Sequence, residues 1–184
     1  MELYLIRHPR VAVAPQLCYG RSDLPLAGDA LTDARRLRAL LPPEFTLVSS
    51  PLARCRLLAE ALAPSPNFDE RLTEIDFGAW EMRAFEAIGR DSMDAWAADP
   101  FGFRPPQGET ADEMSRRVLA CMAQWRAREC ERLVVVSHGG PLRAIAGSLL
   151  EMPQLRWLDL DFACGRLTRF DLSALCVRLA WFNL

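Results

Sequence analysis

Short apolar runs alternate along the chain with stretches in which apolar residues recur at helical spacing. Runs typical of buried strands lie at 3–6, 45–48 and 133–136, and two further strands are predicted in the tail at 160–170 and 176–182. Helices are predicted at 31–41, 52–62, 85–98 and 111–128, and another begins near Pro141 or Leu142. Thr110 or Asp112 is the expected cap of the helix that starts at Ala111.

Strands that alternate with helices predict a three-layer α/β/α sandwich around a largely parallel central sheet. We find no internal repeat, no low-complexity tract and no linker that would separate two units, so residues 1–184 are expected to form a single domain. The segment 99–108 contains three prolines and two glycines and predicts a loop. Residues 72–77 predict an irregular or short extended segment.

The composition is that of a folded globular protein, with a formal net charge of −2. This charge favours neither nucleic acid nor an anionic membrane as a partner. The six cysteines form no CxxC pair, and the chain is long enough to build a core without disulfides, so we expect reduced thiols and a cytoplasmic location. We find no signal peptide and no apolar run near the ~20 residues that span a bilayer.

The two histidines of the chain both follow a predicted buried strand. His8 comes after the first strand, next to Arg7, and His138 comes after the strand 133–136. Ligands of open α/β sheets bind beyond the carboxyl ends of the strands, so the two imidazoles are expected to meet at one site. A lone histidine at such a position more often has a structural role, but two histidines in equivalent positions favour a role in function.

Three chemistries are open to this pair. A metal site needs at least one further ligand, and the arginine beside His8 disfavours a dication. Ser137 and His138 are neighbours on a strand and point to opposite faces, so they are no nucleophile–base pair. Phosphoryl transfer fits best, because arginine binds phosphate oxygens in bidentate fashion and a neutral histidine nitrogen can be the nucleophile.

Four segments resemble the motifs of the histidine phosphatase superfamily, also called phosphoglycerate mutase-like. They are Leu5-Ile6-Arg7-His8, Ser49-Ser50-Pro51-Leu52-Ala53-Arg54, Leu72-Thr73-Glu74-Ile75-Asp76-Phe77-Gly78-Ala79-Trp80-Glu81 and Val135-Val136-Ser137-His138-Gly139-Gly140. Their order and spacing agree with the family from residue 3 to residue 147. The resemblance implies the phosphoglycerate mutase-like fold and a phosphomonoesterase that needs no metal and no cofactor.

The resemblance also implies a role for each motif residue. His8 would be the nucleophile that becomes a phosphohistidine. Arg7, Arg54 and His138 would surround the transferring phosphoryl group and take part in catalysis. Glu74 would be the general acid that protonates the leaving alkoxide and then activates water.

Other polar residues near the motifs are weaker candidates. Glu81 is the rival of Glu74 as proton donor. Arg21 and Ser22, on the loop after His8, are expected to reach the phosphate or the substrate, as is Arg83. Gly139 is expected to shape the pocket or the turn.

The remaining aromatic and basic residues are assigned to the core and to the surface. Trp157 and Trp181 are expected in the core. Solvated helix faces are expected to carry Arg35, Arg36, Arg38, Arg116 and Arg117.

A narrower match points to the alpha-ribazole phosphatases of cobalamin assembly. The segments 77–83 and 108–109 and a tail that ends near Asn183 carry it. The expected substrate is therefore a small phosphate ester, alpha-ribazole 5'-phosphate or cobalamin 5'-phosphate. A phosphoglycerate mutase, a broad-specificity sugar-phosphate phosphatase and a non-catalytic phosphate-binding protein stay open as alternatives, as does a homodimer.

Two departures from the family pattern put the substrate in doubt. Pro9 replaces the usual glycine after the nucleophile and supplies no backbone N–H. The family often has a phosphate-binding asparagine several residues later, but none occurs between His8 and Gly20. Arg21 or Ser22 would have to substitute for it.

Overall fold

The computed structural model describes residues 1–128 and 130–184 and is built on a six-stranded sheet. The strands are β1 (Glu2–Arg7), β2 (Thr46–Ser49), β3 (Asn67–Phe68), β4 (Arg132–Ser137), β5 (Leu167–Leu172) and β6 (Val177–Trp181). Their order across the sheet is β3-β2-β4-β1-β5-β6. The first four strands of that order are parallel to one another. β5 pairs antiparallel with β1, and β6 pairs antiparallel with β5. The prediction of a largely parallel sheet is confirmed.

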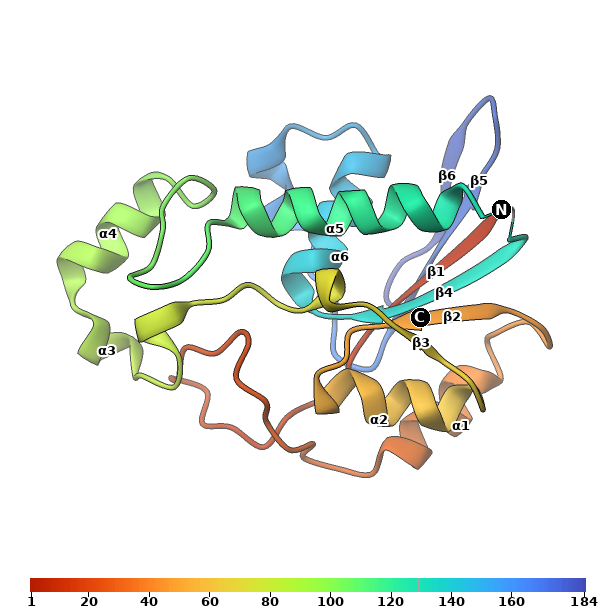
Figure 1. Ribbon diagram of the computed structural model, residues 1–184, viewed down its shortest axis with the longest axis horizontal. Coiled ribbons are helices and arrows are strands. Elements are labelled where there is room, and N and C mark those ends of the chain that lie inside the picture. Colours follow the sequence, from red (N-terminus) through yellow and green to blue (C-terminus); the bar gives the residue numbers. More distant parts are fainter. Residues whose placement is uncertain (129) are drawn as a thin grey trace.

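Helices cover both faces of the sheet and complete the predicted three layers (Figure 1). The α-helices are α1 (Ala30–Arg38), α2 (Ala53–Leu62), α3 (Phe85–Ile88), α4 (Arg90–Ala98), α5 (Ala111–Arg126) and α6 (Gly139–Leu149). Short 3₁₀ segments lie at η1 (Glu70–Leu72), η2 (Gly78–Trp80) and η3 (Gln154–Asp159). α1 and α2 lie on one face, α5 and α6 lie on the other, and α3 and α4 project at one end.

The central strand β1 is apolar on both sides because both faces of the sheet are covered. Leu3 and Leu5 pack in the cluster under α5 and α6. Tyr4 and Ile6, which alternate with them, pack in the cluster under α1 and α2. The short apolar run at the start of the chain therefore belongs to both cores at once.

The start of α5 carries the predicted cap. The Thr110 side chain accepts a hydrogen bond from the Glu113 N–H, and the Glu113 carboxylate accepts one from the Thr110 N–H. Farther along the same layer, Gly147 of α6 lies against the Trp157 ring, where an added Cβ would come within 2.1 Å of the indole. This close approach lets Trp157 pack in the core, as the sequence predicts.

Two predicted boundaries and two predicted environments are wrong. The helix expected at 85–98 is broken at Gly89, whose φ of +93° lies outside the helical region, so it forms α3 and α4. The strand expected from residue 160 begins only at Leu167, because residues 160–166, which follow η3, form a loop with a turn. Trp181 is 40% exposed, since β6 is an edge strand. Arg117 is not a solvated residue, as described below.

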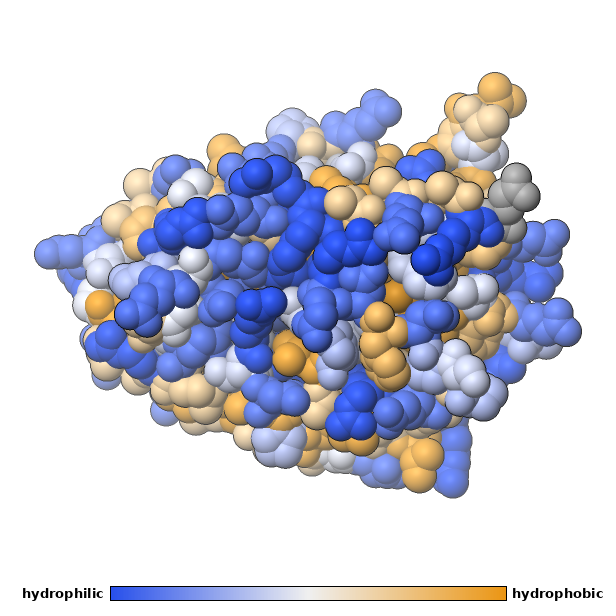
Figure 2. Space-filling model, in the orientation of Figure 1, coloured by the Kyte–Doolittle hydropathy of each residue, from blue (hydrophilic) through white to orange (hydrophobic). Residues whose placement is uncertain are grey.

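The surface view shows a largely hydrophilic face (Figure 2). The turn between β5 and β6 stands out with apolar side chains, among them Leu175, which is 97% exposed. Within residues 1–128 and 130–184, no helix has the length and apolarity needed to cross a membrane.

Candidate active site

The carboxyl ends of β1 and β4 bring the two histidines together. Arg7 and Ser137 are partners in the parallel register of these strands, and His8 and His138 follow them directly. The two imidazole centroids are 5.1 Å apart. The prediction that both histidines meet at one site is confirmed.

His8 is 2% exposed, and one of its ring nitrogens is fixed by the backbone. Its Nδ1 lies 2.6 Å from the Pro9 carbonyl oxygen. A carbonyl can only accept, so Nδ1 carries the proton and the lone pair of Nε2 is free. Pro9 removes a backbone donor from this turn, yet its carbonyl sets the tautomer that a nucleophilic Nε2 requires.

His138 is fully buried and has the opposite tautomer. The Arg54 Nε donates to its Nδ1 over 3.1 Å, and a guanidinium can only donate. Nε2 of His138 therefore carries the hydrogen, and it lies 2.8 Å from the Ser50 hydroxyl oxygen. Both rings are neutral, and His138 holds the Arg54 guanidinium in place.

Arg54 ties the loop after His8 to helix α2. It is fully buried, and its two terminal nitrogens donate to the carbonyl oxygens of Ser22 at 2.7 Å and of Gly20 at 2.5 Å. One donor hydrogen remains on each of those nitrogens, because a guanidinium has five donors. Gly20 has no room for a Cβ, which would lie 1.9 Å from the Ile75 carbonyl oxygen.

Arg7 keeps an unused buried donor. Its Nη1 donates to the Phe162 carbonyl oxygen over 2.6 Å, while its buried Nε has no hydrogen-bond partner among the described residues. The segment that carries Phe162 is held by Asn183, which accepts from the Ala163 N–H and donates to the Asp161 carbonyl. An unpartnered cationic donor at a strand end is suited to an incoming anion.

Glu74 faces the N-terminus of α6. One carboxylate oxygen accepts from the Ile75 N–H at 3.0 Å and the other from the Gly140 N–H at 3.2 Å. The Arg117 guanidinium fixes the backbone of this segment by donating to the Glu74 carbonyl oxygen, and it also pairs with Glu109. The carboxylate is thereby oriented by two backbone donors rather than by a cation.

The other candidate acid, Glu81, is committed to structure. Its carboxylate accepts from the backbone N–H groups of Gly20, Arg21, Ser22 and Phe77 and from the Ser22 hydroxyl. Burial raises the pKa of Glu81, but these hydrogen bonds outweigh burial and the net shift is downward. A carboxyl group held ionised in this way is a poor proton donor.

A first prediction concerns this carboxylate. Glu81→Ala should destabilise the protein by on the order of 3 kcal/mol, because several backbone donors of the loop lose a charged acceptor together. Urea unfolding followed by circular dichroism measures the change. Glu86→Ala, at an exposed position of α3, is the matched control and should leave the free energy of unfolding unchanged. Equal stability of the two variants would contradict this role for Glu81.

A cavity of about 330 Å³ opens over His8, Arg7, Arg54 and Glu74. Its remaining walls come from the loop after His8, from the η2 segment and from α3 and α4, namely Pro15, Leu17, Cys18, Tyr19, Phe77, Trp80, Phe85, Met93 and Trp96. The structure thus brings four of the five predicted catalytic residues to one cavity. The fifth, His138, lies behind it.

The weaker candidates do not line this cavity. The Arg21 side chain pairs with Asp76 over 3.4 Å and is 47% exposed, and the Ser22 hydroxyl is taken by Glu81. Arg83 donates to the Ala87 carbonyl on the exposed side of α3. A Cβ added at Gly139 would lie 3.5 Å from the central carbon of the Arg7 guanidinium, which is ordinary contact distance.

The sequence matches the histidine phosphatase superfamily (branch 1) over residues 3–184. The chain belongs to this superfamily. An adenosylcobalamin/alpha-ribazole phosphatase of Salmonella typhimurium is 30% identical over 164 residues, covering 83% of this chain and 81% of the relative. A probable phosphoglycerate mutase of Klebsiella pneumoniae is 30% identical over 165 residues, covering 83% and 76%. The crystal structure of the alpha-ribazole phosphatase from Shigella flexneri superposes with a TM-score of 0.90 at 27% identity, covering 100% and 96%.

Both histidines of this histidine phosphatase are held neutral. Burial, then the charges of Arg54 and Arg7, lower the pKa of His8 to about 3, although the Pro9 carbonyl opposes the shift. Burial and the same arginines lower the pKa of His138 well below its ordinary value. A free lone pair on His8 is therefore available throughout the neutral range.

A second prediction follows for stability against pH. When the chain unfolds, the two histidines regain pKa values near 6.5, so below this pH the unfolded state binds more protons than the folded state. The free energy of unfolding should therefore decrease as the pH is lowered from 6.5 to about 5. The decrease should be up to about 1.4 kcal/mol per pH unit for each histidine. Urea unfolding at several pH values measures this slope. A curve that stays flat, or a slope that His138→Asn leaves unchanged, would contradict it.

Two functional residues of this histidine phosphatase were not predicted. Ser50 lies inside the second motif, and its position after β2 could have marked it as a partner of His138. Arg117 is predicted on a solvated face, but its side chain is only 19% exposed, and its guanidinium binds Glu109 and the Arg71, Thr73 and Glu74 carbonyls. No local pattern reveals this, because the three carbonyls that it binds lie 43 to 46 residues away in the sequence.

Proposed function

We propose that this histidine phosphatase hydrolyses an organic phosphomonoester through a phosphohistidine on His8, and that alpha-ribazole 5'-phosphate is its substrate. The two unused donor hydrogens of Arg54 and the free Nε of Arg7 are the donors that would bind the phosphoryl oxygens. They stabilise the charge on the equatorial oxygens without reorganisation.

The reaction has two balanced steps. Nε2 of His8 attacks phosphorus in line, the bond from phosphorus to the ester oxygen breaks, and Glu74 gives that oxygen its proton. Water then attacks the phosphohistidine and gives a proton to Glu74, which releases inorganic phosphate and restores neutral His8. While it is phosphorylated, the imidazole keeps its Nδ1–H and carries positive charge, which the Pro9 carbonyl stabilises.

The apolar wall of the cavity carries the substrate assignment. Beyond Arg7 and Arg54, the residues that line it include no further cation. A phosphoglycerate carboxylate that stays in this cavity would lie against the apolar wall without a partner, which costs several kcal/mol. A nucleoside-like body instead gains free energy by covering the apolar side chains of this wall, among them Trp96. The relatives named for alpha-ribazole support the same choice.

Steady-state kinetics with a panel of phosphate esters tests this assignment. We expect kcat/KM for alpha-ribazole 5'-phosphate to exceed that for 3-phosphoglycerate by at least about 100-fold. A chelator should leave both rates unchanged, and a large loss would restore the metal interpretation. Fast mutase turnover with little free phosphate would favour the phosphoglycerate mutase alternative.

Location and assembly belong to the same proposal. The six cysteines are free, which supports a reducing, cytoplasmic compartment. The edge strand β6 and the segment after it carry exposed apolar side chains, including Leu179, Trp181 and Phe182, which support a homodimer. Light scattering measures the mass in solution.

A further inference from the structure

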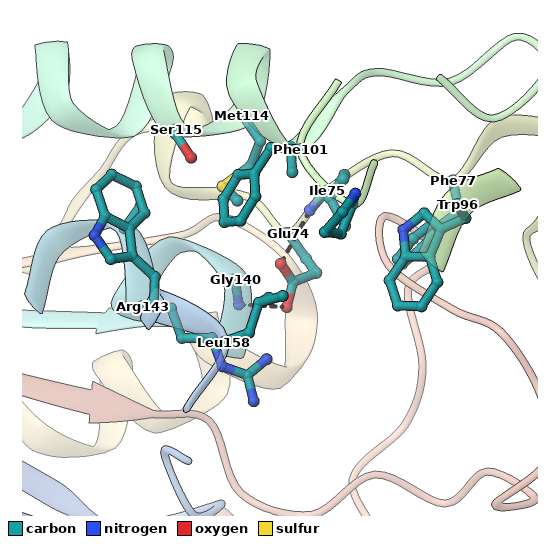
Figure 3. Close-up of a pocket in the computed structure, with 14 residues that line it drawn as sticks. Glu74, Ile75, Phe77, Trp96, Phe101, Met114, Ser115, Gly140, Arg143 and Leu158 are labelled. Carbon is teal, nitrogen blue, oxygen red and sulfur yellow. Dashed lines mark hydrogen bonds between the residues drawn. The ribbon is translucent and has the colours of Figure 1, made fainter. Parts of the chain in front are cut away.

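A second, smaller chamber lies on the other side of Glu74. Glu74, Phe77 and Trp96 line both this chamber and the cavity over His8, so the two spaces share a wall. Figure 3 shows the Glu74 carboxylate amid the lining side chains of this chamber, with Phe101 and Met114 close by. Nothing in the two reaction steps above uses this space.

The walls of the chamber are apolar and largely aromatic. Phe101 and Trp157 meet edge to face with their centroids 6.0 Å apart. The chamber measures about 160 Å³. An apolar cavity of about 150 Å³ is sufficient to hold benzene in another protein, so a single aromatic ring fits a space of this size.

Two polar side chains of the chamber have donors to spare. The Ser115 hydroxyl is buried without a hydrogen-bond partner among the described residues, and it lines the chamber. The Arg143 Nε donates to the Leu160 carbonyl oxygen over 2.9 Å, which leaves the terminal nitrogens of this guanidinium for a ligand. An arginine among aromatic residues favours a planar ring, on which the guanidinium can stack. A buried hydroxyl without a partner costs free energy until a ligand supplies an acceptor.

We propose that this chamber is a substrate subsite that binds a planar aromatic ring of the leaving alcohol. The inference rests on the proposed function. The ester oxygen must lie beside Glu74 to receive its proton, and the group attached to that oxygen therefore starts at the wall between the two spaces. The ring enters the chamber past Glu74 and packs between Trp96, Phe101 and Trp157, while Arg143 covers it.

Two alkyl phosphates that differ only by a ring test this subsite. Ethyl phosphate and 2-phenylethyl phosphate both release an alkoxide, so their chemistry is matched. Burial of the ring should raise kcat/KM for the phenyl compound over the ethyl compound by at least about tenfold in the wild type. If the wild type treats both alike, the proposal is wrong.

Variants that fill the chamber should remove this preference. Ala111→Phe places a ring in the space from the first turn of α5, and Leu158→Trp narrows it from a rim position that is 44% exposed and tolerates change. Both should bring the ratio of the two kcat/KM values close to one. The matched controls are Ala120→Phe, on the exposed side of α5, and Leu155→Trp, 64% exposed on η3, and both should keep the wild-type ratio.

The outcomes separate this inference from the proposed function. If thermal denaturation shows that both filling variants are folded, and both keep the wild-type ratio of kcat/KM values, the ring binds elsewhere and the subsite is refuted. If the wild type forms no acid-labile phosphoenzyme with ethyl phosphate, the function itself fails, whatever the ratio. If only the filling variants lose the preference for 2-phenylethyl phosphate, and phosphoenzyme still forms from ethyl phosphate, both the subsite and the proposed function are supported.

Discussion

His8→Ala should abolish the phosphoenzyme and lower kcat by at least about 10⁴-fold. The variant removes the free Nε2 lone pair of His8, and among the described residues that line the cavity none other is a histidine that could replace it. His138 cannot take over, because its Nδ1 is occupied by Arg54 and its Nε2 by Ser50. Quenching in alkaline detergent after mixing with a substrate labelled at phosphorus measures the covalent intermediate directly, because phosphohistidine is stable in alkali and is lost in acid.

The matched control for His8 is the other histidine. His138→Asn should still form labelled enzyme, more slowly, because Arg54 loses the acceptor that holds it. Equal labelling of the wild type and His8→Ala would disprove the nucleophile assignment. Tight phosphate binding by a wild type that never becomes labelled would favour the non-catalytic alternative.

Glu74→Gln should lower kcat for an alkyl phosphate by about 10²–10⁴-fold, the usual contribution of a positioned general acid. The amide has nearly the shape of the carboxyl group but no proton to give at the ester oxygen. With p-nitrophenyl phosphate, whose leaving group needs no proton, phosphorylation of His8 should stay fast. Hydrolysis should then become limiting, because no base activates water, and the phosphoenzyme should accumulate.

A rapid-quench time course with both substrates distinguishes these steps. The expected signature is a burst of p-nitrophenol followed by slow release of phosphate. Glu81→Gln is the control, because that carboxylate lies among backbone donors of the loop and gives up no proton. If Glu81→Gln caused the burst and Glu74→Gln did not, the two roles would have to be exchanged.

The strands that carry the histidines were predictable because their signals are local. The runs at 3–6 and 133–136 are apolar on every residue, and each is followed directly by a histidine. Parallel pairing then places both ends at one edge of the sheet. The roles of Arg54 and Glu74, in contrast, came from the family resemblance, since their side chains reach the site from a helix and from an irregular segment.

Other features depend on tertiary contacts and could not be predicted from the sequence. Arg21 and Arg117 are both arginines with polar neighbours in the sequence, yet one is exposed and the other is buried against the Glu74 segment. Gly89 divides a stretch that reads as one helix, because its backbone has a positive φ. The second chamber joins α5, α6 and η3 to the 99–108 loop, and the spacing of no single element encodes it.

The anchor of Arg7 has a consequence for how the enzyme is made. Arg7 leaves the ribosome long before Phe162, whose carbonyl fixes its guanidinium, and before Asn183, which holds the segment around Phe162. β1 also cannot take its place in the sheet until β4 and β5, the two strands that pair with it, have been synthesised. A nascent chain stalled before these segments emerge carries His8 and Arg7 but cannot position them. Phosphatase activity therefore requires that synthesis has passed Asn183, and shorter nascent chains cannot attack phosphate esters.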